Sequence, residues 1–292
     1  MTDICCIGHI ARDRIIKETA PKIVDCAGGS AYYVAWALQA LPHHMDIQLI
    51  TSVNPVMMAE VERLREAGIP VIVYMSPDNV FFENKYDGDM DHCVQRVLAK
   101  SAPFTIQQLE GIEAKVFHLG TLLADDFAPE VVEFLAKKGD VCIDVQGYLR
   151  TIRDEKVYPM EWTDKLRLLK QTAILKANEW ESQTLTGFAD PYQAAEQIHD
   201  WGVREVLITL GSNGSVIYAD GHFYDIPAYP PSQLIDATGC GDTYCAGYLY
   251  ARANGMDYAE SGRFAAAMCT LKLEHTGPFD RTIDDVRRIL NP

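Results

Sequence analysis

Short apolar runs alternate with amphipathic segments along most of the chain. DICCIG (3–8) and KVFHLG (115–120) are two of the apolar runs, and SAYYVAWALQAL (30–41) and APEVVEFLAKKG (128–139) have helical spacing. Buried strands that alternate with helices are typical of parallel sheets covered on both faces. The pattern therefore predicts an α/β fold with a doubly wound, mostly parallel sheet. Because no repeat or linker divides the chain, we expect residues 1–292 to form a single domain.

Two segments interrupt this alternation. Residues 80–103 show two alternating strands around an Asp-Gly pair, Asp87-Gly88, which is a hairpin signal. Residues 14–26 are extended where a crossover helix is expected after the first strand. Together they predict a small β-sheet outside the main one, which covers a site as a lid. A pair of edge strands on the main sheet is the alternative.

The charge of the chain favours a small-molecule partner. With 26 Lys and Arg against 41 Asp and Glu, the formal net charge is -15, which repels nucleic acid and anionic membranes. A phosphate compound would need local compensation from backbone N–H groups or a divalent cation. We expect a cytoplasmic protein because no apolar run reaches membrane-spanning length and the start lacks a signal peptide. The eight cysteines contain no C-x-x-C pair, which predicts reduced thiols.

A glycine-rich turn precedes a helical segment near the C-terminus, in the motif IDATGCGD (235–242). Helical spacing begins after Gly241, so the turn lies at a helix N-terminus, where unpaired N–H groups bind anions. The predicted donors are the N–H groups of Gly239, Cys240, Gly241 and Asp242. Asp242 is placed to accept a proton from a hydroxyl, such as that of a phosphoryl acceptor. Simple capping by Asp242 or Thr243 is the alternative.

Two further motifs follow predicted strands. The turn with Thr209, Gly211 and Gly214 is suited to contact a nucleotide, although a plain hairpin turn has the same pattern. Asn178 ends a strand, and Glu181 follows one helical turn later, where its carboxylate can hold Mg²⁺ through water. An N-cap Asn with the Glu of a capping box is the alternative for that pair.

The order of these motifs resembles the ribokinase-like (PfkB) carbohydrate kinases over essentially the whole chain. That resemblance implies a doubly wound α/β core with a β lid, and transfer of the γ-phosphoryl group of ATP to an alcohol with Mg²⁺. Asp242 is then the catalytic base, and Gly239, Cys240 and Gly241 complete the anion hole. Asn178 and Glu181 organise metal and phosphates, while Thr209, Gly211 and Gly214 contact the nucleotide. Asp13, Gly28 and Gly29 bind the acceptor.

The departures from the family pattern point to a branch. Tyr33 stands where sugar kinases carry a substrate-binding Asn, and the run DVQGYLR (144–150) is similar to the myo-inositol kinase-like branch. A polyol needs many side-chain hydrogen bonds, for which Asp13, Gln146 and Arg150 are candidates. Gln146 as a turn cap and Arg150 in a structural ion pair are the alternatives. The favoured partner is thus a small polyol or sugar, and a homodimer through the lid is compatible with the family.

Other functions are left open by the sequence. A nucleoside or furanose sugar kinase of the same fold is one, because Tyr32, Tyr33, Phe81 and Phe82 offer aromatic platforms for a base. A catalytically silent regulator that binds a nucleotide or sugar is another, although the intact Asp242 argues against it. The resemblance also implies a monovalent cation among backbone carbonyls near Asp236 and the EHTGPFD loop (274–280). A dehydrogenase is disfavoured, since no G-x-G-x-x-G follows the first strand.

Overall fold

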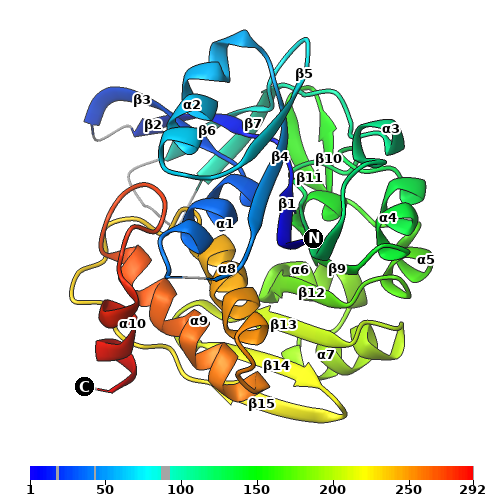
Figure 1. The fold of residues 1–292 in the computed structure, drawn as a ribbon, viewed down its shortest axis with the longest axis vertical. Coiled ribbons are helices and arrows are strands. Elements are labelled where there is room, and N and C mark those ends of the chain that lie inside the picture. Colours follow the sequence, from blue (N-terminus) through cyan, green and yellow to red (C-terminus); the bar gives the residue numbers. More distant parts are fainter. Residues whose placement is uncertain (18–19, 43, 87–92, 292) are drawn as a thin grey trace.

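The computed structural model describes residues 1–17, 20–42, 44–86 and 93–291. Its main sheet has nine strands, and seven neighbouring ones are parallel (Figure 1). In spatial order the nine strands are β15 (His222–Ile226), β14 (Ser215–Ala219), β13 (Glu205–Thr209), β12 (Ile174–Asn178), β9 (Asp140–Asp144), β8 (Ala114–Gly120), β1 (Thr2–Ile7), β4 (Ile47–Val53) and β5 (Val71–Met75). Strands β14 and β15 run antiparallel.

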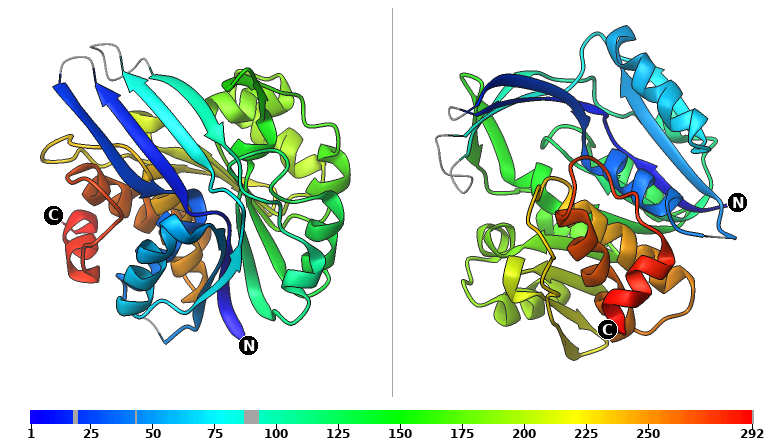
Figure 2. Two further views of the ribbon diagram at one scale, coloured as in Figure 1. Left: turned by 90° about the horizontal axis from the view of Figure 1, so that it is seen from above. Right: turned by 90° about the vertical axis from the view of Figure 1, so that its left-hand side faces the viewer.

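Helices cover both faces of this sheet, as the views in Figures 1 and 2 show. One face carries α1 (Ser30–Gln39), α2 (Met58–Glu66), α8 (Cys240–Ala253) and α9 (Tyr258–Leu273), with α10 (Ile283–Leu290) packed on α9. The other carries α3 (Ile106–Leu109), α4 (Pro129–Ala136), α5 (Lys165–Leu169), α6 (Glu179–Thr186) and α7 (Pro191–Asp200). Short 3₁₀ turns are η1 (Pro55–Met57), η2 (Val145–Leu149) and η3 (Gly211–Asn213).

Strand β1 shows why the sheet is buried on both sides. Ile4 and Cys6 contribute to the core under α1, α8 and α9, whereas Cys5 and Ile7 contribute to the core under α3–α7. Successive side chains of a strand point to opposite faces, so a run that is apolar at every position requires cover on both. The predicted doubly wound fold is confirmed.

A second sheet of six strands projects from the main body (Figure 2). Its order is β10 (Arg150–Arg153), β11 (Lys156–Pro159), β7 (Cys93–Ala99), β6 (Phe81–Tyr86), β2 (Ala11–Lys17) and β3 (Ala20–Gly28), and only β2 and β6 are parallel. The lid is confirmed as a separate sheet, so the edge-strand alternative is wrong. The Asp87-Gly88 turn lies outside the described residues.

The structure corrects the predicted extent of the lid in two places. The expected single extended segment, 14–26, is a pair of antiparallel strands, in which Asp13 lies opposite Cys26. Strands β10 and β11 were not predicted at all. Their two-residue turn consists of Asp154 and Glu155, both with left-handed φ angles, of 48° and 64°. Such turns normally carry Asn-Gly or Asp-Gly, so this hairpin lacks its usual sequence signal.

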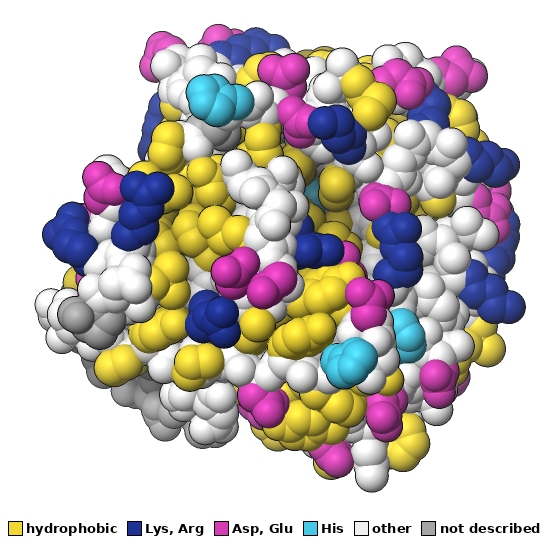
Figure 3. Space-filling model, turned by 60° about the horizontal axis from the view of Figure 1, so that its bottom comes forward, with side chains coloured by type: hydrophobic (Ala, Val, Ile, Leu, Met, Phe, Trp, Pro, Cys, Tyr) yellow, Lys and Arg dark blue, Asp and Glu magenta, His cyan; other side chains and the backbone are white. Residues whose placement is uncertain are grey.

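The surface is mixed in charge on the face drawn in Figure 3. Acidic and basic side chains are interspersed there, and the basic ones that the view draws form no continuous patch. Within the described residues, no helix has the length and apolar character needed to cross a membrane. The seven cysteines whose side chains are described are free thiols.

We predict that Gly247→Val destabilises the fold, because α8 and α9 approach closely at this glycine. A Cβ added there would lie 2.8 Å from Met268 Sδ and 2.9 Å from the Cα of Ala265. Overpacking of this kind costs typically about 1–3 kcal/mol. Urea unfolding measures the loss, with Gly111→Val as the control, since no atom lies within 4 Å of a Cβ at that exposed turn. Equal stabilities of the two variants would contradict the close helix contact.

Candidate active site

The glycine-rich turn lies at the N-terminus of α8, which begins at Cys240. Gly239 is the N-cap residue and has a left-handed φ of 75°. A Cβ there would lie 2.6 Å from Cδ1 of Tyr33, so only glycine allows the turn to touch this ring. The predicted set of four N–H donors needs one correction, because the Cys240 N–H donates to the carbonyl of Ala237 at 3.1 Å. The N–H groups of Gly241 and Asp242 belong to the first helical turn, which offers them no intrahelical acceptor.

A buried lysine lies directly beside this turn. Lys176 of β12 is only 5% exposed, and its Nζ would be 2.9 Å from a Cβ at Gly241. The same Nζ lies 3.0 Å from Asp144 Oδ2 and 3.9 Å from Glu181 Oε2. Burial alone would lower the pKa of Lys176, but the surrounding carboxylates of Asp144, Glu181 and Asp242 hold it above its usual range. A permanent positive charge therefore lies at the anion-binding turn.

Asp242 is held in a site that disfavours its ionised form. Burial, together with the negative charge of Asp144, raises the pKa of Asp242 from 3.8 to about 6, against the opposing effect of Lys176. At pH 7 the carboxylate is thus mostly ionised but more basic than an exposed aspartate. This is the property that a general base requires.

Asp13 of β2 lies in the same site, on the lid side. Its Oδ2 would be 2.0 Å from a Cβ at Gly28, so glycine at the end of β3 makes room for this carboxylate. Burial and the charge of Asp242 raise the pKa of Asp13 to about 7. Tyr33 of α1 is 5% exposed, and burial and the charge of Asp13 raise the pKa of its hydroxyl. Asp13, Gly28, Tyr33, Gly239 and Asp242 thus form one cluster.

Gly29 serves as the N-cap of α1 with a φ of 110°. A Cβ at this position would lie 2.3 Å from the carbonyl oxygen of His9, in the segment between β1 and β2. The glycine pair therefore lets the lid strand return closely to the end of β1. Gly29 shapes the base of the cluster through its backbone.

The motifs after β12 and β13 meet at the carboxyl edge of the sheet. Asn178 lies opposite Thr209 in the strand register. Asn178 and Glu181 form a capping box, in which Asn178 Oδ1 accepts from the Glu181 N–H at 2.8 Å and Glu181 Oε2 accepts from the Asn178 N–H at 2.7 Å. The capping alternative is therefore observed for this pair. It uses only Oε2 of Glu181, so Oε1 of the same carboxylate can still accept hydrogen bonds.

The glycines of the next turn have different surroundings. Gly211 has a φ of 57° and no atom within 4 Å of an added Cβ, so its backbone face is open. A Cβ at Gly214 would lie 2.0 Å from the carbonyl of Ile226, which shows that this glycine packs against β15. Of the two, Gly211 is the residue that a donor molecule can approach.

The run after β9 places Gln146 and Arg150 around the same edge. Asp144, rather than Gln146, caps this turn, because its Oδ1 accepts from the Gln146 N–H at 3.2 Å. Arg150 begins β10. Burial raises the pKa of Glu181 above its usual range, and the positive charges of Lys176 and, to a smaller extent, Arg150 oppose this rise. Arg150 thus lies on the Glu181 side of the site.

The residues fit a hydrated Mg²⁺ better than a directly ligated one. No group of three or more His, Cys, Asp or Glu side chains that could hold a metal occurs among the described residues. Mg²⁺ keeps several waters and binds through one or two carboxylates together with substrate phosphates. Glu181 Oε1 and Asn178 are the groups that would hold such waters.

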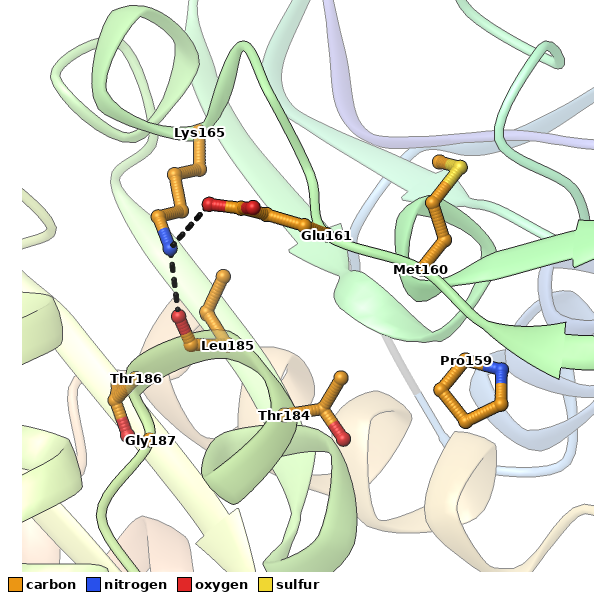
Figure 4. A pocket seen from close by; sticks show the side chains of 8 residues that line it. All are labelled: Pro159, Met160, Glu161, Lys165, Thr184, Leu185, Thr186 and Gly187. Carbon is orange, nitrogen blue, oxygen red and sulfur yellow. Dashed lines mark hydrogen bonds and ion pairs between the residues drawn. The ribbon is translucent and has the colours of Figure 1, made fainter.

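Two surface hollows lie away from the cluster. The larger, about 350 Å³, is lined by Pro159, Met160, Glu161, Lys165 and Thr184–Gly187 (Figure 4). It contains no predicted site residue, and the Nζ of Lys165 donates a hydrogen bond to the carbonyl oxygen of Leu185 at 3.0 Å. The smaller, about 280 Å³, includes Leu210, Asn213 and Ser215 beside η3. Neither hollow contains Asp13 or Asp242.

Sequence reasoning missed Lys176 and Asp144 as site residues. A signal for Lys176 existed, since a lysine inside the apolar strand AILKAN needs a buried anionic partner. Asp144 was recognised only as the start of the run 144–150. Its pairing with Lys176 depends on β9 and β12 being neighbours in the sheet, which the sequence order does not give.

We predict that Asp242→Asn stabilises the protein at pH 8 and has little effect at pH 4. The folded-state pKa of Asp242 lies above its ordinary value, so stability present at low pH is lost as pH rises through about 6. Asparagine resembles the protonated form, and the expected gain at pH 8 is roughly 1–3 kcal/mol. Urea unfolding at both pH values tests this, with the exposed Asp78→Asn as the control. A loss of stability at pH 8 would contradict the described electrostatics.

Known proteins resemble this chain over its whole length. The model of the pfkB family carbohydrate kinases matches residues 1–283. A cytidine kinase from Thermococcus kodakarensis is 26% identical over 293 residues, which cover 97% of this chain and 100% of the relative. A pyrophosphate-dependent kinase of the ribokinase family, complexed with a pyrophosphate analog and myo-inositol, has a TM-score of 0.87 at 26% identity, with 98% and 99% of the two chains covered.

Arabidopsis thaliana ribokinase complexed with ribose and ATP has a TM-score of 0.79 at 21% identity over 100% of both chains, a likeness in fold. The family match extends from the first strand to the start of α10, and it includes the strands, the lid and the α8 turn described above. The chain therefore belongs to the pfkB family of carbohydrate kinases and is a phosphotransferase that acts on an alcohol acceptor.

Proposed function

We propose that this kinase phosphorylates one hydroxyl of a cyclic polyol of the myo-inositol type. The observation that carries the proposal is the pair of carboxylates, Asp13 and Asp242, that share one partly desolvated site next to the N-terminus of α8. Burial and the charge of Asp242 raise the pKa of Asp13 to about 7, and burial and the charge of Asp144 raise that of Asp242 to about 6. Such a pair can accept hydrogen bonds from neighbouring hydroxyl groups, which a polyol supplies in abundance.

Asp242 acts as the general base. It accepts the proton of the acceptor hydroxyl while that oxygen bonds to the terminal phosphorus of the donor and the bridging P–O bond of the donor breaks. The negative charge that develops on the transferred group faces the N–H groups of Gly241 and Asp242 and the ammonium of Lys176. Mg²⁺, when bound through Asn178 and Glu181, supplies further charge neutralisation on the donor phosphates.

Asp13 orients the acceptor on the lid side, and Tyr33 limits its size. The Tyr33 ring touches Gly239 and therefore closes the site between α1 and α8. A ring with many hydroxyl groups fits between two carboxylates better than an apolar molecule, because these half-buried carboxylates would otherwise lose their hydrogen bonds to water. Gln146 is the further side chain that we propose for acceptor contact.

A nucleoside acceptor is less well supported, although a relative is named a cytidine kinase. The Tyr32 hydroxyl donates to Glu60 at 2.6 Å, and its side chain is buried. Phe82 is also buried, and the ring of Phe81 lies beneath the guanidinium groups of Arg12 and Arg14, at 4.6 Å and 5.0 Å from its centroid. Tyr32 and Phe82 are buried, and the Phe81 ring already stacks with arginine, so these three rings are poorly placed to bind a base.

The donor carries a terminal phosphoanhydride, and we propose ATP, with inorganic pyrophosphate as the alternative. The motifs around Thr209 and Gly211 support ATP. The alternative is motivated by three similar structures of pyrophosphate-dependent kinases, with TM-scores of 0.86 to 0.88 and identities of 26–27%. The proposed roles of Asp242, Gly241 and Lys176 are the same for both donors, since these residues contact the transferred group.

We predict that myo-inositol gives the highest turnover when the purified protein is tested with myo-inositol, ribose, fructose and cytidine. Each acceptor is combined with Mg-ATP and, separately, with Mg-pyrophosphate, and the phosphorylated product is measured by ³¹P NMR. Turnover with cytidine above that with myo-inositol would contradict the proposed acceptor. Turnover with pyrophosphate alone would reject ATP and leave the proposed acceptor in place.

In the same assay, Asp242→Asn is expected to lower kcat by a hundredfold or more, because positioned general bases contribute about 10²–10⁴-fold. Asp78→Asn, which removes an exposed carboxylate, should leave kcat unchanged. Equal kcat in wild type and Asp242→Asn would remove Asp242 from the role of base. If wild type binds ATP but transfers nothing to any acceptor, the silent regulator is the better function.

A further inference from the structure

Lys272, near the end of α9, has a completely buried side chain. Its exposed fraction is 0%, which is rare for lysine unless the ammonium group is bound on several sides. Nζ donates to the carbonyl oxygen of Asp236 at 3.1 Å and to that of His275 at 3.1 Å, and it lies 3.6 Å from Asp236 Oδ2. Three oxygen atoms thus surround this ammonium group.

The two carbonyls belong to two different segments that meet beside the anion-binding turn. Asp236 begins the motif that ends at Asp242, and its Oδ1 accepts from the Thr238 N–H at 2.9 Å. His275 begins the loop between α9 and α10, and its Nε2 lies 3.0 Å from the carbonyl of Pro278. The ammonium group therefore joins the start of the glycine turn to the C-terminal loop.

The turn also contacts α9 one helical turn before Lys272. The Cys269 thiol donates to the carbonyl of Cys240 at 3.1 Å. This thiol and, to a smaller extent, the Lys272 charge hold the pKa of Cys240 below its usual range, against the effect of burial. The Lys272 charge thus acts on the first residue of α8, which directly precedes the anion-binding N–H groups of Gly241 and Asp242.

A monovalent cation from solution does not fit between these carbonyl oxygens when the Lys272 ammonium group is bound there. K⁺ is bound in proteins by carbonyl oxygens that replace its hydration shell. Here the carbonyls of Asp236 and His275, in the two segments where the family resemblance implies such a cation, already bind a covalently attached positive charge. A second cation at the same oxygens would be repelled at short range in a poorly screened site.

We propose that the ammonium group of Lys272 takes the place of a monovalent cation and holds the anion-binding turn in its working geometry. Lys272 is a positioning residue, because it acts through Asp236 and does not touch the transferred group. The chain consequently needs neither K⁺ nor Na⁺ for phosphoryl transfer. The inference rests on the proposed function where it is tested by kcat. The test by unfolding midpoints does not depend on that function.

The first test uses the wild-type protein. We expect equal kcat in 150 mM KCl and in 150 mM choline chloride, with the acceptor and donor that give the highest turnover. The thermal unfolding midpoint should also be equal in the two salts, and that comparison needs no activity. A twofold or larger activation by K⁺ at constant ionic strength, or stabilisation by K⁺ alone, would overturn the proposal.

The second test uses Lys272→Met. Methionine ends where the lysine Cε lies, so it removes only the volume of the ammonium group and leaves space for one small cation. In choline chloride this variant should lose tenfold or more in kcat, and KCl or NH₄Cl should restore at least half of the loss. Its unfolding midpoint should rise in KCl relative to choline chloride.

The matched control is Lys138→Met. Lys138 Nζ also donates to two backbone carbonyls, those of Glu110 at 2.6 Å and Ile112 at 2.9 Å, far from the glycine turn in the sequence and on the other face of the sheet. No K⁺ dependence of kcat is expected for this variant. Full activity of Lys272→Met in choline chloride, or an equal K⁺ response in both variants, would contradict the role of Lys272. If Lys272→Met fails to fold, the wild-type salt comparison still decides.

If no donor and acceptor pair gives turnover in wild type, the proposed function fails, whereas the unfolding midpoints still test Lys272. Equal wild-type midpoints in the two salts, together with a K⁺-dependent midpoint in Lys272→Met, would support the inference on their own. The two failures are therefore distinguishable.

Discussion

The ammonium group of Lys176 is the charge on which the active site depends. It lies where the ends of β9 and β12 and the first turns of α6 and α8 meet, 3.0 Å from Asp144 and beside Gly241. Without it, the carboxylates of Asp144, Glu181 and Asp242 would share a poorly solvated region and lose the ammonium group that compensates all three. Removing one partner of a buried ion pair is strongly destabilising, so the same lysine supports the fold and the anion-binding turn.

Close contacts at two glycines connect the acceptor side of the site to its phosphate side. Gly28 makes room for Asp13, and Gly239 makes room for the ring of Tyr33. Since Tyr33 belongs to α1 and Gly239 precedes α8, the packing of these two helices fixes the width of the site. A second buried lysine, Lys272, fixes the start of the same turn from the side of α9.

Much of the fold follows from local patterns in the sequence. Apolar runs such as DICCIG identify strands that are buried on both faces, and the glycine turn identifies the start of α8. The β10–β11 hairpin could not be predicted, because Asp154 and Glu155 form its turn without the usual glycine. Lys176 and Lys272 were missed for another reason. One partner of each, Asp144 for Lys176 and Asp236 for Lys272, lies 32 or 36 residues away, and only the order of strands and helices brings it close.

The residue types of the site were easier to predict than its electrostatics. The sequence suggested four free N–H groups in the anion hole, whereas the local turn uses that of Cys240 for the carbonyl of Ala237. The sequence also gave no indication that the charge of Asp242 raises the pKa of Asp13. That coupling depends on β2 of the lid reaching the N-terminus of α8, which is a tertiary contact.

The pH dependence of kcat/KM for phosphoryl transfer tests the central claim most directly. If Asp242 is the base in this site, kcat/KM should rise tenfold per pH unit at low pH and level off above an apparent pKa of about 6. The coupled Asp13 is expected to broaden this rise toward pH 7. A profile that stays flat from pH 5 to pH 8, at constant donor ionisation, would contradict the assignment of Asp242 as the base.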